Sequence, residues 1–209
     1  MLEVLRNIVL EVNAAASLDE VLRIIVSRVR MAMGTEVCSV YIRDKAAERF
    51  VFRATEGLNP EQIGKASLAR GEGLVGLVAE REEPVNLDSA AQHPAFRPLP
   101  GIGEEPFHSF LGVPIIHQRE VLGVLVIQQS AGRRFDESEE AFLVTMSAQL
   151  AGVIAHAMVT GEVPDESSPD RGSAYSRISG VPGAPGVAIG TAVVVSPAAN
   201  LYTVPRQTS

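Results

Sequence analysis

The spacing of apolar residues changes along this chain, and the change constrains the fold more than any other feature of the sequence. Between residues 2 and 29, apolar side chains recur every three or four positions, which is the period of an α-helix. Between 36 and 55 they recur at every second position, as in strands that bury one face. The helical spacing returns at 143–157. The chain is therefore predicted to belong to the α+β class.

The remaining segments are predicted to complete an antiparallel sheet that is covered on both faces. Strands are predicted at 36–44, 49–55, 84–87, 109–116 and 121–128. Helices are predicted at 2–16, between the caps Ser17 and Gly34, at 71–80, and after the acidic cap at 136–139. We expect the long N- and C-terminal helices to cover one face of the sheet. The short helix and a long loop at 88–107 are expected to cover the other face and to enclose half of a cavity.

The composition changes after residue 160. Residues 161–176 are rich in Gly, Ser, Pro and acidic residues and have no apolar periodicity, which predicts a flexible linker. A new apolar pattern starts near Gly180 and ends after a single strand, which cannot bury its own faces. We therefore expect a complete domain at 1–160, a linker at 161–176, and the first element of a truncated further domain at 177–209.

Composition argues against several classes of function. The net charge of −7 and the pI of about 5.2 disfavour binding to nucleic acid or to an anionic membrane, since both need a basic surface. The chain has one cysteine, so it can form no internal disulfide and no multi-cysteine zinc site. No apolar run reaches the roughly 18 residues that span a bilayer, and no secretory signal opens the chain. A cytoplasmic protein is the expectation.

Three local patterns and the order of the elements resemble a GAF domain, a module that senses small ligands. The patterns are the strand at 37–41 (VCSVY), the start of the short helix at 71–76 (GEGLVG), and the strand pair formed by 109–115 (SFLGVPI) and 121–125 (VLGVL). The strand pair is the most specific of the three. The resemblance covers about residues 2–159, and it implies a sensor domain whose ligand lies between the sheet and the 88–107 loop.

The end of the chain carries a second resemblance. Residues 179–190 (SGVPGAPGVAIG) are similar to the opening of enzyme I of the phosphoenolpyruvate:sugar phosphotransferase system. A GAF domain ahead of such an opening resembles the nitrogen-related enzyme I family. That resemblance implies downstream phosphotransferase domains that use magnesium, and a histidine carrier protein that receives the phosphate. The family's Gly-Gly-x-Thr-Ser-His motif is missing here, so this chain itself is expected to be catalytically inert and to hold no cofactor or metal.

The resemblance, together with the polar and aromatic residues near the expected cavity, gives a set of candidate ligand-binding residues. Ser39, Tyr41 and Ser109 are strand residues that could orient a small molecule, and Arg97 is the basic residue of the loop. The full candidate set is Ser39, Tyr41, Asp88, Ser89, His93, Phe96, Arg97, Phe107, Ser109 and Leu111. The resemblance implies glutamine or 2-oxoglutarate as the effector, and the residues alone do not select between them.

Two further hypotheses stay open. The apolar stripes at 2–16 and 143–157 could pair with a second copy as a four-helix bundle, which would make the domain a ligand-free homodimerisation module. An enzyme of the methionine sulfoxide reductase type would need a reactive thiolate and a resolving partner. Cys38 is the chain's one thiol and alternates with Val40 and Ile42, which favours a small buried side chain instead. Because a flexible linker transmits force poorly, regulation is expected through domain docking or dimer geometry.

Overall fold

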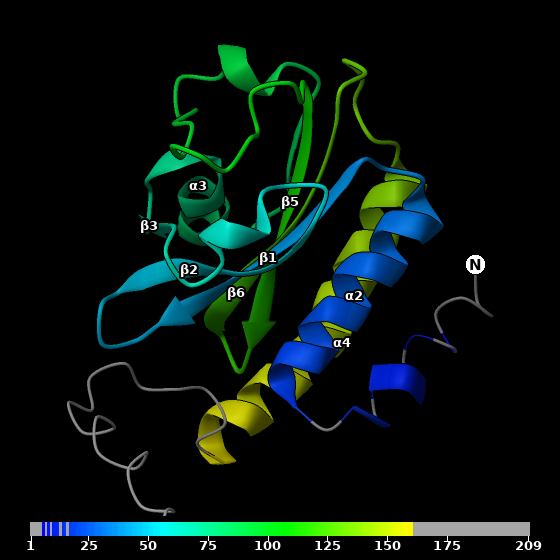
Figure 1. The fold of residues 1–209 in the computed structure, drawn as a ribbon, viewed down its shortest axis with the longest axis vertical. Coiled ribbons are helices and arrows are strands. Elements are labelled where there is room, and N and C mark those ends of the chain that lie inside the picture. The colour runs from blue at the N-terminus through cyan, green and yellow to red at the C-terminus, as the bar shows by residue number, and fades with distance from the viewer. Residues whose placement is uncertain (1–5, 7, 9, 13, 16, 161–209) are drawn as a thin grey trace, which may run out of the picture. The chain divides into compact units, whose positions relative to one another are not determined.

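A computed structural model describes residues 6, 8, 10–12, 14, 15 and 17–160 of this chain (Figure 1), with side chains through residue 156. The predictions for 161–176 and 177–209 therefore lie outside the described residues, and so does most of the helix predicted at 2–16. The inward position predicted for Ala157 also falls outside them.

The centre of the domain is a six-stranded sheet with the order β3-β2-β1-β6-β5-β4. Every neighbouring pair of strands is antiparallel. The strands are β1 Val37–Asp44, β2 Arg49–Glu56, β3 Ser67–Ala69, β4 Val85–Leu87, β5 Ser109–His117 and β6 Glu120–Gln129. The predicted α+β class and antiparallel sheet are confirmed. The sequence prediction missed β3, because three residues at a sheet edge are too few to show an alternating pattern.

Besides the helical residues at 6, 8, 10–12 and 14, three helices and two 3-10 turns surround the sheet among the described residues. They are α2 Leu18–Met33, α3 Gly73–Arg81, α4 Glu137–Thr160, η1 Pro60–Gln62 and η2 Ala90–Gln92. The predicted caps of α2 are confirmed. Ser17 Oγ accepts a hydrogen bond from the backbone N–H of Glu20 at 3.3 Å, and Gly34 ends the helix in the left-handed conformation. None of the described helices has both the length and the apolar character needed to cross a membrane.

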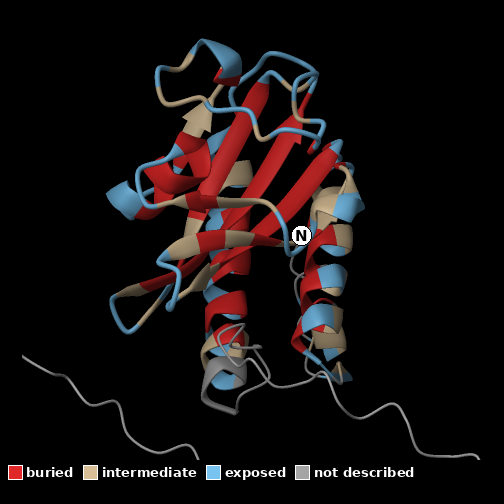
Figure 2. Cartoon of the chain, turned by 60° about the vertical axis from the view of Figure 1, so that its left-hand side comes forward, coloured by how far each residue is buried: buried red, intermediate tan, exposed pale blue. Residues whose placement is uncertain are grey.

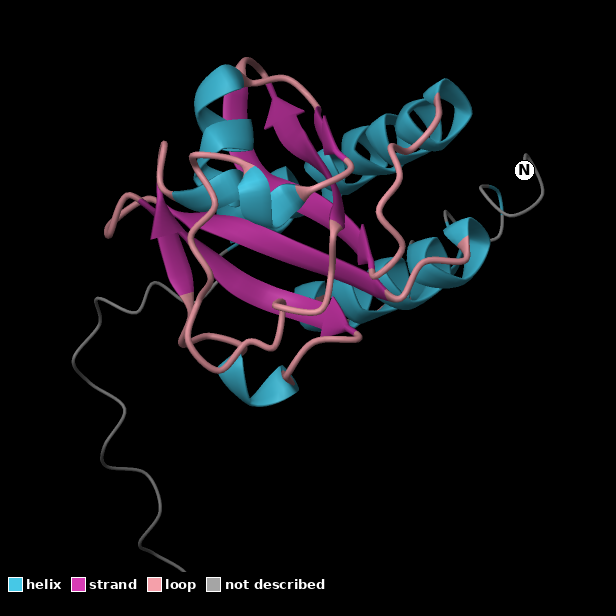
Figure 3. Ribbon diagram, turned by 90° about the horizontal axis from the view of Figure 1, so that it is seen from above, coloured by secondary structure: helices cyan, strands magenta, loops and turns pink. Residues whose placement is uncertain are grey.

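The alternation of side chains along β1 divides the apolar core into two layers. Cys38, Val40 and Ile42 belong to the layer that contains the buried residues of α2 and α4. Val37 and Tyr41 belong to the layer that contains the buried residues of α3. Helices α2 and α4 pack against each other and against the sheet, while α3 lies across the other face (Figures 1 and 3). Between the two layers, β1, β5 and β6 are buried along most of their length (Figure 2).

Candidate functional site

The loop at 88–107, called the lid from here on, is held by hydrogen bonds within itself and to the β2–β3 connection. The backbone N–H of Asn59 donates to the Ile102 carbonyl at 3.0 Å, and its side-chain amide donates to the Gly101 carbonyl at 2.9 Å. Within the lid, the Glu104 carboxylate accepts a hydrogen bond from the backbone N–H of Leu99 at 2.9 Å. These contacts fix residues 99–104 over the α3-side face of the sheet.

Apolar side chains of the lid pack directly on that face. Ile102 is fully buried, and Phe96 and Phe107 are half-buried against the same core layer. The Tyr41 ring lies in this layer with its centroid 5.1 Å from that of Phe52. The lid is therefore part of the packed core, and a ligand between sheet and lid would have to fit among these side chains.

Buried polar groups on the same face are left available for a ligand. Tyr41 and Gln128 are each only 3% exposed, and neither side chain has a hydrogen-bond partner among the described residues. Among the described residues, every side-chain polar atom that is fully buried has a hydrogen-bond partner. The Tyr41 hydroxyl and the Gln128 amide have no such partner, so these atoms are not fully buried and still touch solvent. Ser39 also faces this side, and its hydroxyl pairs with that of Thr55 at 2.9 Å. Polar groups that share one apolar face are a feature of small-molecule sites.

Glu104 brings a negative charge to these groups. Burial raises the pKa of its carboxyl above the usual value of 4.5, against the lowering effect of the Leu99 N–H, and the neighbouring Glu105 raises it further. Burial also raises the pKa of Tyr41, and the Glu104 carboxylate adds to that rise, so the two groups interact. Glu104 has no ion-pair partner among the described residues. A half-buried acid without a partner cation is a common mark of a functional site.

The predicted lid residues lie partly at the surface. Asp88 and Arg97 are exposed, and the Arg97 guanidinium donates to the carbonyls of Pro94 and Phe96 in its own loop. Ser89 and His93 are half-buried. The His93 Nδ1 atom accepts a hydrogen bond from the Ala95 N–H at 3.2 Å, which organises the lid itself.

Two predicted site residues lie on the opposite face of the sheet. Leu111 is buried in the layer that contains α2 and α4, and strand alternation places Ser109 on the same side. The Ser109 hydroxyl bonds to the Ala131 and Arg133 carbonyls and accepts from the Arg133 N–H, so it fixes the connection after β6. Phe110 is the β5 residue that faces the lid. The structure thus brings Ser39, Tyr41, Phe96 and Phe107 to one side and leaves Ser109 and Leu111 on the other.

Two residues of this site were missed by sequence reasoning. Glu104 stands beside Glu105 in a Gly- and Pro-rich loop, where a pair of acids is typical of a solvated surface. Gln128 lies near the end of β6, where an amide is expected to point into water. The signal that could have found Gln128 is its in-phase spacing with Val124 and Val126, which both face the lid.

Thiol chemistry and metal binding find no support in the described residues. Cys38 is fully buried, and burial raises the pKa of its thiol, as does the nearby Glu56, so a reactive thiolate is disfavoured. No group of three or more His, Cys, Asp or Glu side chains in this part of the chain could hold a metal ion. The residues described here do not fit the magnesium that the family resemblance implies for the longer protein.

Comparison with known proteins identifies the fold family. A family model described as GAF domain matches residues 17–154. The chain belongs to the GAF family. A solved GAF domain from a phosphoenolpyruvate-protein phosphotransferase of Coxiella burnetii is 51% identical, with a TM-score of 0.73, and the match covers 77% of this chain and 95% of that one. The corresponding GAF domain from Acinetobacter is 47% identical, with a TM-score of 0.71 and coverage of 78% and 97%.

Longer relatives share most of this GAF chain. A protein of Salmonella typhimurium named phosphoenolpyruvate-dependent phosphotransferase system is 45% identical over 191 residues, which is 91% of this chain and 25% of the relative. The chain thus spans about a quarter of the length of the curated phosphotransferase relatives it matches. The similarity extends over more of the chain than the GAF match at 17–154.

Proposed function

We propose that this GAF domain is the regulatory sensor of a phosphoenolpyruvate–protein phosphotransferase. The observation that carries the proposal is the 51% identity to a GAF domain of such an enzyme over 95% of that domain's length. The enzyme I-like pattern at 179–190 supports the same assignment. In this proposal the domain controls autophosphorylation of catalytic domains further along the protein, and with it phosphate transfer to a histidine carrier protein. A cytoplasmic location is part of the proposal.

The charge of the site favours L-glutamine over 2-oxoglutarate as the effector. Glu104 offers a carboxylate to an ammonium or amide donor, and it would repel a dicarboxylate. Arg97, the basic residue of the lid, is turned onto lid carbonyls. The Tyr41 hydroxyl and the Gln128 amide can donate to the single carboxylate of an amino acid. We therefore assign to the site an amino acid with an uncharged amide side chain.

Isothermal titration of the chain against L-glutamine, L-glutamate and 2-oxoglutarate tests this function. We expect saturable binding of L-glutamine, weaker binding of L-glutamate and no binding of 2-oxoglutarate, because Glu104 opposes each added carboxylate. Tighter binding of 2-oxoglutarate would refute the effector assignment. Absence of binding for all three would remove the sensor function and leave the dimerisation module as the remaining hypothesis.

The exposed face of α4 favours dimerisation as a second function. From Ala141 to His156 the helix contains no Asp, Glu, Lys or Arg. Its exposed residues include Ala141 and Ala148, and Val144 is 41% exposed. A solvated helix face normally carries charges, whereas an uncharged face is typical of helix–helix contacts. We propose that two copies pair through this face.

Replacing Val144 by Arg is expected to weaken self-association at least about tenfold, because an unpaired charge would enter the contact between helices. Sedimentation equilibrium of the parent chain and the variant measures this effect. Ile63→Arg is the matched control, since Ile63 is 38% exposed in the β2–β3 connection, away from α4. A parent chain that stays monomeric at high concentration, or equal effects of both substitutions, would contradict dimerisation through α4.

A further inference from the structure

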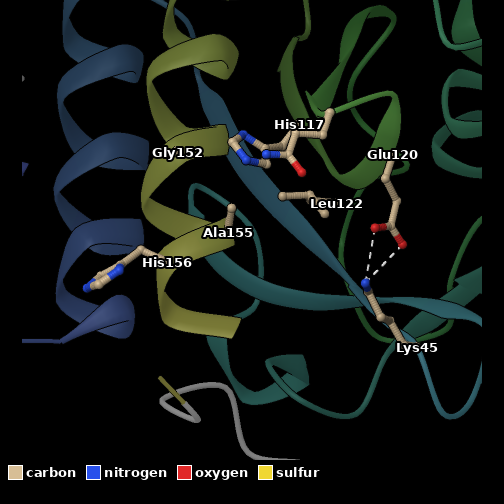
Figure 4. A pocket seen from close by; sticks show the side chains of 8 residues that line it. Lys45, His117, Glu120, Leu122, Gly152, Ala155 and His156 are labelled. Atoms are coloured by element: carbon tan, nitrogen blue, oxygen red, sulfur yellow. Dashed lines mark hydrogen bonds and ion pairs between the residues drawn. The ribbon is translucent and has the colours of Figure 1, made fainter. Parts of the chain in front are cut away.

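A hollow lies at the end of the sheet away from the lid. It has a volume of about 450 Å³ and is bounded by the β1–β2 turn, the β5–β6 turn and the last turns of α4 (Figure 4). Lys45, His117 and Glu120 come from the two turns, and Gly152 and His156 come from the helix. None of these residues belongs to the site under the lid.

The polar groups of the hollow are arranged to receive a hydrogen-bond acceptor. Glu120 is the carboxylate that lines it, and this group already accepts from Lys45 Nζ at 3.0 Å and from Arg43 Nη1 at 3.2 Å. Arg43 also forms an ion pair with Glu48 at 2.8 Å, so Lys45 is the main counter-charge of Glu120. The Lys45 ammonium has three N–H donors, and its side chain is 56% exposed, so donors remain free to point into the hollow. Gln118 adds an amide at the rim.

One feature of the hollow is costly for the fold and serves no packing purpose within the described residues. Gly152 is an exposed helical residue, and a Cβ added to it would meet no atom within 4 Å. Glycine at such a position costs about 0.5–1 kcal/mol relative to alanine. The positive φ angles of Gln118 and Arg119, 48° and 68°, are those that the two-residue hairpin turn between β5 and β6 requires. The glycine is explained if another segment approaches the helix closely at this point.

The chain itself supplies a segment of matching charge within reach. His156 lines the hollow, and residues 161–169 (GEVPDESSP) follow soon after it. That segment carries Glu162, Asp165 and Glu166 and no basic residue. An extended chain covers about 3.3–3.6 Å per residue, so these carboxylates can reach the hollow from the end of α4. Charge attraction to Lys45 favours this segment over an apolar partner.

We propose that residues 161–169 dock in the hollow, with an acidic side chain on Lys45 and the backbone passing close to Gly152. Docking would hold the segment that follows α4 against the two turns of the sheet and so restrict the position of the chain after it. If the domain is the sensor proposed above, a change in the sheet could alter this contact and thereby affect the downstream domains. The docking itself does not depend on that function.

Zero-length carbodiimide cross-linking of the full chain tests the contact. This reagent joins a lysine to a carboxylate that touches it, and the lysines of this chain are Lys45 and Lys65. We expect a cross-link within one chain between Lys45 and Glu162, Asp165 or Glu166, reduced several-fold at 1 M salt, where charge interactions are screened within about 3 Å. The exposed Lys65 is the control and should not link to these acids. Linkage of Lys45 to Glu120 alone, or linkage to 161–169 only between two chains, would overturn the proposal.

A charge exchange provides a second test that needs no cross-link. Lys45→Glu is expected to increase the rate of protease cleavage within 161–169 about fivefold, as expected for loss of an exposed ion pair of about 1 kcal/mol. Adding Glu162→Lys and Glu166→Lys to this variant should restore the slow rate, because the opposite charges meet again. Lys65→Glu is the control for general effects of the charge. Equal cleavage in the parent and Lys45→Glu, or failure of the exchange to restore protection, would contradict docking.

Discussion

Replacing Glu104 by glutamine is expected to weaken binding of L-glutamine about 10- to 100-fold while leaving the fold at least as stable. A hydrogen bond to a charged group contributes about 1.5–3 kcal/mol, and the substitution removes the charge but keeps the size and an oxygen that can accept from Leu99. Titration calorimetry of the variant measures the loss. Glu105→Gln is the matched control, because Glu105 is the adjacent exposed acid and should change binding little.

Glu104→Gln is also expected to raise stability at neutral pH, because the pKa of Glu104 is raised in the folded chain. The Glu104 pKa is raised in the folded chain, so the folded state holds its proton more tightly than the unfolded state. The free energy of unfolding therefore falls as the pH rises from 4.5, the ordinary pKa, through the pKa of Glu104 in the folded chain. Above the folded pKa this loss of stability is complete. We expect the Tm of Glu104→Gln to exceed that of the parent at pH 7 and to match it below pH 4.5. A lower Tm at pH 7 would show that the carboxylate stabilises the fold.

Ile102→Ala is expected to lower the free energy of unfolding by about 2–5 kcal/mol. Ile102 is fully buried in the core layer under the lid, so its truncation leaves a cavity as well as removing apolar contacts. Urea unfolding of both chains measures the change. Ile63→Ala is the matched control, since Ile63 is 38% exposed and its truncation should cost less than about 0.5 kcal/mol. Equal, small effects would mean that the lid is a loose flap rather than part of the core.

Sequence periodicity predicted the parts of the fold whose pattern is unambiguous. The stripe of α2 lies between a serine cap and a glycine cap, and β1 alternates cleanly, so their bounds and inward faces could be predicted. For β5, the pattern did not show which residues face the lid. Phe110 and Leu111 are both large and apolar, and β5 is buried on both faces, so alternation could not decide which of them lies under the lid.

The site could be predicted only where it is built from strands. Ser39 and Tyr41 were found because β1 fixes their direction, and both face the lid side. Glu104 was missed because its burial depends on how the lid folds back onto Asn59 and the core. No local pattern encodes that contact, since it joins residues 42 positions apart. The hollow at Lys45 was missed for the same reason, because three segments distant in the sequence form it.

The most direct test of the account is to map L-glutamine on the ¹⁵N-labelled chain by nuclear magnetic resonance. We expect saturable shifts of the backbone amides of Ser39, Tyr41 and Gln128 and of lid residues 99–104, which form the polar site. We expect no comparable shifts around Lys45 and His117 at the other end of the sheet. Shifts confined to the Lys45 hollow, or no shifts at all at saturating L-glutamine, would contradict it.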